Sequence, residues 1–292
     1  MIESRTFSRR LFIAANYTLM TALGLLCILP FIHVWALSAS SAGAVSAGYV
    51  TFWPVQFNSD AYRLILNDPK FIRAFGVSLE RLLLGTILGL TMTLFTAYPL
   101  SKESGSFRSR TVYVWYFVVT MLIGGGLVPT YMAVRNYGLL DSIWALVLPG
   151  AVSVFHVVLL LNFFRGLPKP LEESAFIDGA GHLTILLRIY LPLSLPAMAT
   201  IALFTMVGHW NAWFDGLLYM NRTDNYPLQT YLQSLIAQPN ILQITNLSEF
   251  LDVTERTVRA AQIFVGTLPI LIVYPFLQRF FMKGIVLGSV KG

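Results

Sequence analysis

Residues 167–196 read LPKPLEESAFIDGAGHLTILLRIYLPLSLP and connect two apolar stretches of the chain, residues 141–164 and 194–220. The part from Leu171 to Ile177 follows a proline and is acidic at its start, as a helix N-terminus favours. Asp178-Gly179-Ala180-Gly181 then predicts a turn, because two glycines within three residues are poor helix interior. Helical spacing resumes from His182 to Tyr190. The segment therefore predicts two short helices joined by a tight elbow.

Pro192 and Pro196 should end the second short helix and begin the next apolar stretch. An ordinary amphipathic pair of surface helices would explain the apolar side of this segment. It would not explain a glycine elbow followed by a proline-bounded return to an apolar stretch. Two stiff helices, a glycine elbow that can enter a cleft, and a carboxylate that can pair with a cation would suit a segment that docks onto another protein. The sequence favours this second interpretation.

Apolar stretches make up most of the remaining chain. Of its 292 residues, 56% are hydrophobic and 12% are charged, whereas a soluble domain carries about 25% charged residues. A helix needs roughly 20 residues to cross the hydrocarbon core of a bilayer. The predicted spans are residues 12–38, 74–99, 111–133, 141–164, 194–220 and 259–283. We predict an all-α membrane protein with six transmembrane helices.

The whole chain, residues 1–292, is expected to form one transmembrane domain, with a core of about 74–283, a coupling loop at 167–193 and a C-terminal tail at 284–292. The apolar run near the amino end is longer than the roughly 7 to 15 residues of a signal peptide, which predicts an uncleaved first helix. Positive residues near the span ends set the orientation. With a cytoplasmic N-terminus, that side holds Arg5, Arg9, Arg10, Lys102, Arg108, Arg110, Arg165, Lys169, Arg188, Arg279, Lys283 and Lys291. Both termini should therefore be cytoplasmic.

The segment from Glu173 to Pro196 resembles the EAA motif of permease subunits in binding-protein-dependent ABC importers. The matching residues are Glu173-Ser174-Ala175, Ile177-Asp178-Gly179-Ala180, Ile189, Leu191-Pro192 and Pro196. Ser174 stands where that family more usually has alanine, which is a small change. The resemblance implies that these are coupling helices, which seat in a groove of the ATPase subunit. It also implies that Glu173 pairs with an arginine of the ATPase.

Other parts of the chain are similar to the carbohydrate branch of these importers, which includes the second permease subunit of the maltose importer. The tail from Gln278 to Gly292 resembles the carboxyl end of that subunit, which reaches between the two ATPases. The runs at residues 124–130 and 210–213 are similar to oligosaccharide and polysaccharide importers, including the alginate type. The resemblance assigns ATPase coupling to Glu172, Glu173, Ser174, Ala175, Asp178, Gly179, Ala180, Lys291 and Gly292.

The resemblance implies a permease that moves a carbohydrate across the bacterial cytoplasmic (inner) membrane by ATP-driven alternating access. Its expected partners are a second homologous permease subunit, two ATPase subunits, a periplasmic or extracellular solute-binding protein, the carbohydrate and membrane lipid. The chain contains no GxxxxGK[ST] phosphate loop. ATP and magnesium should therefore bind in the partner ATPases, and this chain should be a transport subunit rather than an enzyme.

Several other kinds of site find no support in the sequence. The net charge of +6 is spread over short loops, whereas a nucleic-acid protein needs a basic face or run. The single cysteine, Cys27, excludes an intrachain disulfide. No cluster of His, Cys, Asp and Glu has the spacing of metal ligands. We expect no catalytic residue, no metal site and no nucleic-acid partner.

Charged residues inside the apolar stretches should face protein or a water-filled path, because a charge is costly in hydrocarbon. A polar translocation path and an ion pair with the partner subunit both remain open for them. The stretch GHWNAWFD at residues 208–215 combines aromatic faces with hydrogen-bonding groups, as sugar sites do. Tryptophan also anchors helices at the membrane interface. The candidate path residues are Glu80, Arg81, Trp210, Asn211, Trp213 and Asp215.

An ion-coupled secondary transporter is the alternative function. It would need intramembrane carboxylates as ion sites and usually has internal repeats. Only Glu80 and Asp215 qualify, and no repeat is visible. An intramembrane enzyme could use His209 with Asp215, but residues six apart should lie far from the same face of one helix.

Overall fold

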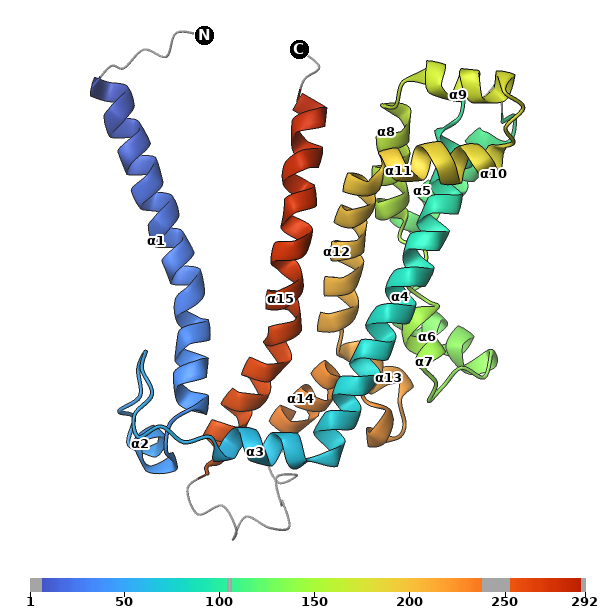
Figure 1. Ribbon diagram of the computed structural model, residues 1–292. Helices are drawn as coiled ribbons and strands as arrows, with labels where there is room; N and C mark the ends of the chain where they lie inside the picture. The colour runs from blue at the N-terminus through green and yellow to red at the C-terminus, as the bar shows by residue number, and fades with distance from the viewer. Residues whose placement is uncertain (1–6, 104, 106, 238–252, 290–292) are drawn as a thin grey trace. The chain divides into compact units, whose positions relative to one another are not determined.

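The computed structural model describes the backbone of residues 7–103, 105, 107–237 and 253–289, with side chains up to Pro275 (Figure 1). Regular structure in these residues is helical, apart from an isolated antiparallel bridge between Ser40 and Phe57. The predicted all-α class is confirmed. The helices are α1 (Phe7–Ser38), α2 (Ala42–Ser46), α3 (Asp60–Asn67), α4 (Pro69–Ser101), α5 (Arg110–Leu122), α6 (Leu127–Asn136), α7 (Ile143–Val147), α8 (Val154–Arg165), α9 (Lys169–Ile177), α10 (His182–Ile185), the π-helix η1 (Leu186–Tyr190), α11 (Leu191–Leu193), α12 (Leu195–Asn211), α13 (Phe214–Tyr219), the 3₁₀-helix η2 (Thr223–Asn225), α14 (Leu228–Ala237) and α15 (Glu255–Ser289).

Three helical segments are long and apolar enough to cross a membrane, namely α1, α4 and residues Glu255–Pro275 of α15. They coincide with the first, second and sixth predicted spans. Helix α5 with α6, and His182–Leu193 with α12, pass the same test only as pairs bent by 114° and 80°. If each bent pair is one span, the described residues contain up to five spans. The predicted spans are therefore present only in part as continuous helices.

The remaining predicted spans are broken where the sequence supplies glycine or polar residues. Gly126, which lies between α5 and α6, has a φ of 80°, a conformation that glycine adopts without strain. The predicted span 141–164 is divided between α7 and α8. Helix α8 has 12 residues, so its length is roughly 18 Å against the ~30 Å of a hydrocarbon core. Apolar composition located these stretches but did not reveal their breaks.

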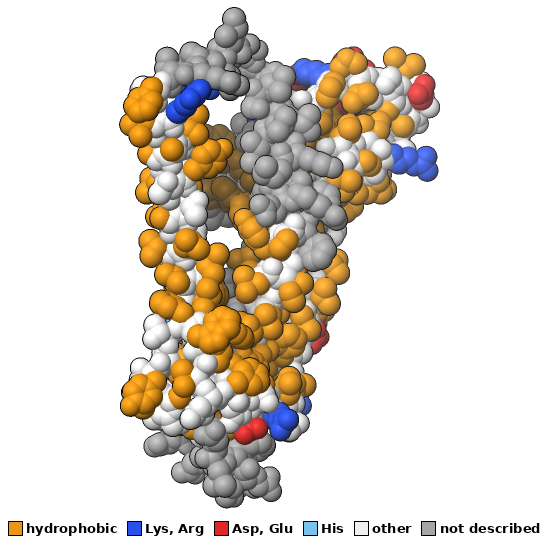
Figure 2. Space-filling view, turned by 60° about the vertical axis from the view of Figure 1, so that its left-hand side comes forward, with side chains coloured by type: hydrophobic (Ala, Val, Ile, Leu, Met, Phe, Trp, Pro, Cys, Tyr) orange, Lys and Arg blue, Asp and Glu red, His pale blue; other side chains and the backbone are white. Residues whose placement is uncertain are grey.

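The chain divides into two compact units, residues 1–72 with 235–268 and residues 73–234 with 269–292. In the first unit, α1 exposes large hydrophobic side chains along much of its length. Hydrophobic side chains also cover much of the described surface in Figure 2. The small core of this unit contains Ala36, Ala44, Val45 and Val50. An exposed apolar surface of this extent is suited to lipid or to the apolar face of a partner.

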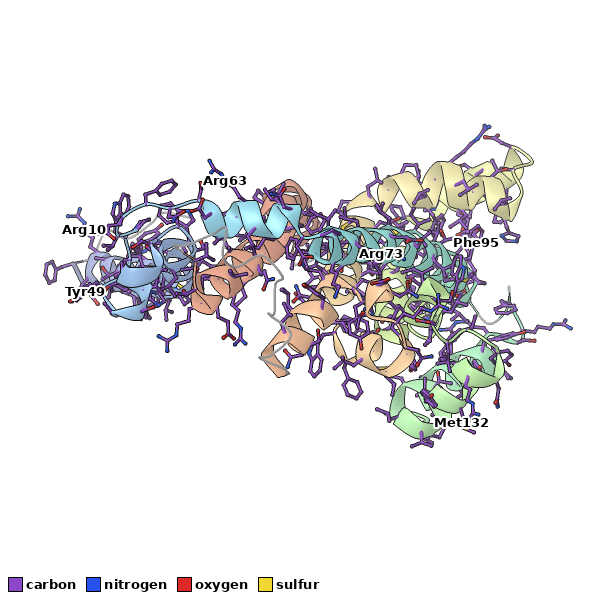
Figure 3. The ribbon with its side chains drawn as sticks, turned by 90° about the horizontal axis from the view of Figure 1, so that it is seen from below. Arg10, Tyr49, Arg63, Arg73, Phe95 and Met132 are labelled. Carbon is purple, nitrogen blue, oxygen red and sulfur yellow. The ribbon has the colours of Figure 1, made fainter. Side chains whose placement is uncertain are left out.

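The second unit contains the main described core. Helix α6 lies at the edge of this unit in Figure 3, where Met132 is 43% exposed. The core unites α4, α8, α9, α10, η1 and α12 through Leu94, Ala97, Tyr98, Leu100, Val157, Leu160, Leu161, Phe164, Ala175, Ile185, Leu186, Tyr190, Ala197 and Ile201. The short helices between α8 and α12 therefore contribute to a packed core. They are anchored to the long helices and do not form a free loop.

Candidate functional site

The predicted elbow is present between α9 and α10. Gly179 follows the C-cap residue Asp178 and has a φ of 79°. The Ala180 amide donates to the carbonyl of Ala175 at 2.9 Å, which closes the end of α9. No atom lies within 4 Å of the position that a Gly179 Cβ would occupy. Backbone conformation, rather than lack of space, therefore requires glycine at this elbow.

The second short helix extends beyond the predicted end at Tyr190. It runs through α10, η1 and α11 to Leu193, with Pro192 inside its last turn. The expectation that Pro192 would stop this helix was wrong. Because the helix widens into a π-turn over Leu186–Tyr190 just before the proline, the backbone continues past a residue that cannot donate a hydrogen bond. Pro196, in contrast, lies in the first turn of α12 as predicted.

Glu172 is held by residues of two other elements. Its carboxylate accepts hydrogen bonds from Lys102 Nζ at 2.6 Å and from the Tyr190 hydroxyl at 2.5 Å. Lys102 Nζ also lies 4.1 Å and 4.3 Å from the ring centroids of Tyr98 and Tyr190. We call Tyr98, Lys102, Glu172 and Tyr190 the clamp. Tyr98 lies in the last turn of α4, and Lys102 is the first residue after that helix. The clamp therefore fixes α9 and η1 to the end of a long helix.

The clamp determines the charge state of Glu172. Burial by itself would raise the pKa of Glu172, but the hydrogen bonds from Lys102 and Tyr190 outweigh burial and hold the pKa below its ordinary value. Because the folded-state pKa of Glu172 is lowered, the ionised carboxylate makes its full contribution to folding stability above the pKa of a glutamate in the unfolded chain. This contribution is lost as the pH falls through the folded pKa. The clamp is therefore charged and intact at neutral pH.

Glu173, the next residue of α9, takes no part in the clamp. Its side chain is exposed and makes no hydrogen bond or ion pair with a described residue. Ile177, one turn farther along α9, is 87% exposed, and Leu183 of α10 is 58% exposed. Exposed apolar side chains together with an exposed carboxylate are typical of a docking surface. Of the other predicted coupling residues, Ser174, Asp178 and Gly179 are exposed, Ala180 is half-buried and Ala175 is buried in the core.

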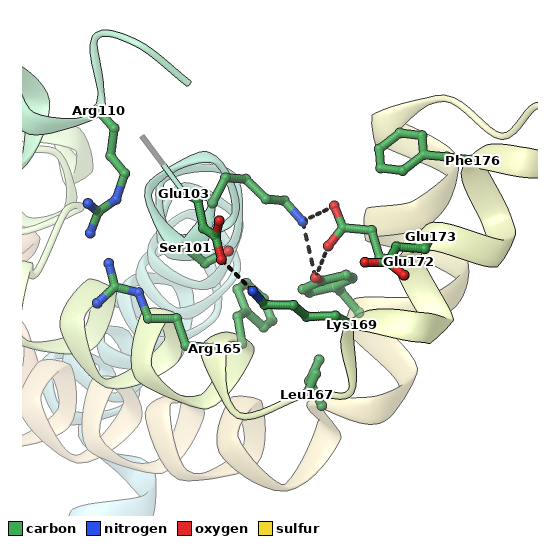
Figure 4. A pocket seen from close by; sticks show the side chains of 12 residues that line it. Ser101, Glu103, Arg110, Arg165, Leu167, Lys169, Glu172, Glu173 and Phe176 are labelled. Atoms are coloured by element: carbon green, nitrogen blue, oxygen red, sulfur yellow. Dashed lines mark hydrogen bonds and ion pairs between the residues drawn. The ribbon is translucent and has the colours of Figure 1, made fainter. Parts of the chain in front are cut away.

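A cavity of about 750 Å³ lies beside α9, between the ends of α4, α5 and α8 (Figure 4). Its charged lining consists of Lys102, Glu103, Arg110, Arg165, Lys169, Glu172 and Glu173. Lys169 of α9 pairs with Glu103, and both side chains are largely exposed. An exposed pair of this kind contributes little stability. The half-buried clamp is therefore the stronger link between α9 and α4.

Sequence reasoning named Glu172 as an ATPase-coupling residue, a role that stays a prediction, and did not anticipate the clamp that it forms with Lys102, Tyr98 and Tyr190. Lys102 stands directly after a long apolar stretch, where a cation could equally be an interfacial anchor. Its pairing across 70 residues with Glu172 has no local signal. Lys291 and Gly292, which the resemblance assigned to the ATPase contact, lie outside the described residues.

A second polar cluster lies where α12 ends. Arg81 of α4 is 2% exposed, and its guanidinium pairs with the Asp215 carboxylate. The same group donates to the carbonyl of Ala212, the C-cap residue of α12, at 3.2 Å. Arg81 therefore satisfies a backbone acceptor that the break in the helix leaves open. The charge of Arg81, which the sequence marked as costly within an apolar stretch, therefore stabilises the interrupted end of α12.

The structure separates the six candidate path residues. Arg81 and Asp215 line a cavity of about 420 Å³. Trp210 is 1% exposed and packs edge-on against Phe75, with ring centroids 5.7 Å apart. Glu80, Asn211 and Trp213 do not line this cavity, and the Glu80 side chain is exposed.

His209 and Asp215 line the same cavity, together with His156, Ser153 and Tyr219. The expectation that His209 and Asp215 would lie far apart assumed one continuous helix, whereas the chain turns after Asn211. An ideal Cβ on Gly85 would lie 2.2 Å from the His209 ring, so glycine is required at this contact between α4 and α12. Among the described residues, no group of three or more His, Cys, Asp or Glu could hold a metal ion.

Comparison with known proteins places this geometry in a family context. Residues 135–286 match the family described as "Binding-protein-dependent transport system inner membrane component". The chain is 39% identical to the polygalacturonan/rhamnogalacturonan transport system permease protein YtcP of Bacillus subtilis, over 97% of this chain and 99% of that protein. It is 39% identical to protein LplC of the same organism, over 98% and 97%.

A solved structure is also similar over nearly the whole chain. It is described as a bacterial ABC transporter involved in the import of the acidic polysaccharide alginate. The TM-score is 0.88 and the identity is 31%, covering 94% of this chain and 98% of that chain.

Proposed function

The chain belongs to the family of binding-protein-dependent transport system inner membrane components, and on this basis we propose that residues 169–193 couple it to a separate ATPase. Like its relatives, it is a permease subunit of a sugar importer of the ABC class, and it is not an enzyme. The proposed coupling mechanism follows from the contacts that anchor α9 and from the side chains that α9 exposes.

The different environments of two neighbouring glutamates carry the proposal. Glu172 is held in the clamp, whereas Glu173 is exposed and Ile177, one turn farther along α9, is exposed as well. A coupling helix needs one part fixed to the membrane domain and another part free to contact the ATPase. Helix α9 meets both conditions, because Ala175 joins the core while Glu173 is exposed and makes no hydrogen bond or ion pair with a described residue.

We propose that ATP-driven closure of two ATPase subunits moves α9 through contacts with Glu173 and the exposed apolar residues. The clamp passes the displacement to α4, and the continuous chain through η1 and α11 passes it to α12. The membrane domain then alternates between outward and inward access, as a two-state element biased at both ends. ATP and magnesium bind in the ATPases.

The proposed topology has six spans, both termini in the cytoplasm and one transmembrane domain formed by the whole chain in the bacterial inner membrane. Bent pairs and the α7–α8 pair would complete the span count. A second permease subunit and an external solute-binding protein complete the importer. Glu80 supports a partner on that side of α4, because a carboxylate exposed on a spanning helix needs a polar neighbour.

The transported solute in this proposal is an oligosaccharide or polysaccharide fragment with acidic sugar units. One relative is named for the transport of polygalacturonan and rhamnogalacturonan, and the similar solved transporter is described as importing the acidic polysaccharide alginate. Arg81 and Asp215 would line part of the path, beside His209. The ion-coupled alternative loses support, because Asp215 is already paired with Arg81 and is not an open ion site.

Replacing Glu173 with alanine tests the coupling role. We expect the variant to remain folded, since Glu173 makes no hydrogen bond or ion pair with a described residue, and to bind the ATPase at least tenfold more weakly, about 1.4 kcal/mol. The measurement is co-purification of the ATPase and sugar-stimulated ATP hydrolysis in the assembled importer. Glu103→Ala, which removes an exposed carboxylate from the neighbouring loop, is the matched control. Unchanged ATPase binding by the Glu173 variant would refute the assignment.

A further inference from the structure

The cavity beside α9 contains two arginines that the coupling proposal does not use. Arg110 is the first residue of α5, and Arg165 is the last residue of α8. Both line the cavity of about 750 Å³, and their side chains point toward one another in Figure 4. Arg110 Nε donates to the carbonyl of Leu100 at 2.9 Å. Neither guanidinium forms an ion pair with a carboxylate of the described residues.

The lining of the cavity carries four cations and three carboxylates, so one positive charge is in excess, and neither arginine is ion-paired with a described carboxylate. Lys102 is matched by Glu172, and Lys169 is matched by Glu103. Two guanidinium groups that face each other repel unless an anion lies between them. Guanidinium forks also suit phosphate, because they donate paired hydrogen bonds to two oxygens of one group. The cavity therefore has the charge and the donor geometry of a phosphate site.

Helix α5 shows where the rest of such a ligand would lie. The helix exposes aromatic side chains in its first two turns, with Tyr113, Trp115 and Tyr116 each at least 50% exposed. Aromatic residues gather at the headgroup level of a bilayer. Farther along, Val119 and Leu122 are also exposed. This face suits acyl chains, whereas a free phosphate ion or an acidic side chain of a protein would leave it uncovered.

We propose that Arg110 and Arg165 bind the phosphate of an anionic glycerophospholipid whose acyl chains lie along the exposed face of α5. Basic pockets between membrane helices recognise such headgroups. The lipid would fill the space beside the clamp and tie the ends of α5 and α8 together. The site requires no ATPase and no sugar, so it is independent of the coupling role of Glu173.

The test uses the purified full chain in detergent with phosphatidylglycerol or phosphatidylcholine added. Native mass spectrometry counts bound lipid, and a thermal-shift assay reports stabilisation. We expect wild type to prefer phosphatidylglycerol, and the Arg110→Gln/Arg165→Gln variant to bind it roughly tenfold to thirtyfold more weakly, as expected for two cations near an anionic lipid. Arg108→Gln is the matched control, because Arg108 lies two residues before Arg110 and is exposed, but does not line the cavity.

Three outcomes would overturn the proposal. One is an unchanged lipid preference in the double variant, and another is an equal loss in Arg108→Gln, which would indicate a diffuse charge effect. The third is full stabilisation of wild type by inorganic phosphate alone, which would assign the arginines to a free anion. The single variant Arg165→Gln keeps the Arg110 bond to Leu100 and should lose about threefold to tenfold in affinity. If the double variant cannot be purified, an unchanged affinity of Arg165→Gln for phosphatidylglycerol would overturn the proposal.

Discussion

Asp215→Ala should destabilise the membrane domain more than any other single substitution considered for this chain. It leaves the Arg81 guanidinium, whose side chain is 3% exposed, without its carboxylate partner. Removing one member of a buried ion pair costs about 3–5 kcal/mol, because the remaining charge is uncompensated; since the Asp215 side chain is 28% exposed, we expect a cost near the lower end of this range. The expected result is a large fall in the thermal unfolding temperature of the purified chain in detergent.

The second half of the same test removes the orphaned charge. In Asp215→Ala/Arg81→Met, no buried cation remains, so we expect a large part of the lost stability to return. Glu80→Gln is the control, because it neutralises a neighbouring residue of α4 that is exposed, and it should change the stability of the isolated chain by less than about 0.5 kcal/mol. Equal effects of Asp215→Ala and Glu80→Gln would contradict the buried pair.

Glu172→Ala should loosen the link between α9 and α4 while leaving the proposed docking face in place. Without its carboxylate, Lys102 keeps only the hydroxyl and ring contacts of the clamp. We expect the ATPase to stay bound, since Glu173 is unchanged, and transport per ATP hydrolysed to fall about tenfold or more. The measurement is sugar uptake and ATP hydrolysis in the same proteoliposomes.

Glu172→Gln separates charge from shape in the clamp. Glutamine can still accept one hydrogen bond, from Lys102 or Tyr190, so this variant should retain more coupling than the alanine variant. Loss of ATPase binding in Glu172→Ala, at the level expected for Glu173→Ala, would show that the two glutamates do not have separate roles.

The two short helices and the elbow of residues 169–193 were predictable because their signals are local. Pro170, the acidic first turn and Gly179 lie within ten residues and fix the helix start and the elbow, and both appear in the structure. The helical class was predictable for a similar reason, since long apolar stretches leave few alternatives in a bilayer.

Breaks and long-range pairs could not be predicted in the same way. Gly126 was visible in the sequence, but nothing local indicated that its φ would be positive and turn α5 away from α6. The pairing of Arg81 with Asp215 depends on the turn after α12, which places Asp215 against a helix more than a hundred residues away. A continuous-helix interpretation therefore misplaced Asp215 relative to His209.

Proximity of α9 to a separate ATPase is tested most directly by cross-linking from Ile177. This side chain is 87% exposed at the end of α9. In a Cys27→Ser background, Ile177→Cys is the only thiol of the chain. It can carry a short photoactivated cross-linker in the assembled importer. We predict capture of the ATPase subunit and protection from a membrane-impermeant thiol reagent added outside the cell. Labelling from outside, or cross-links that never include the ATPase, would contradict the role of α9 as a coupling lever.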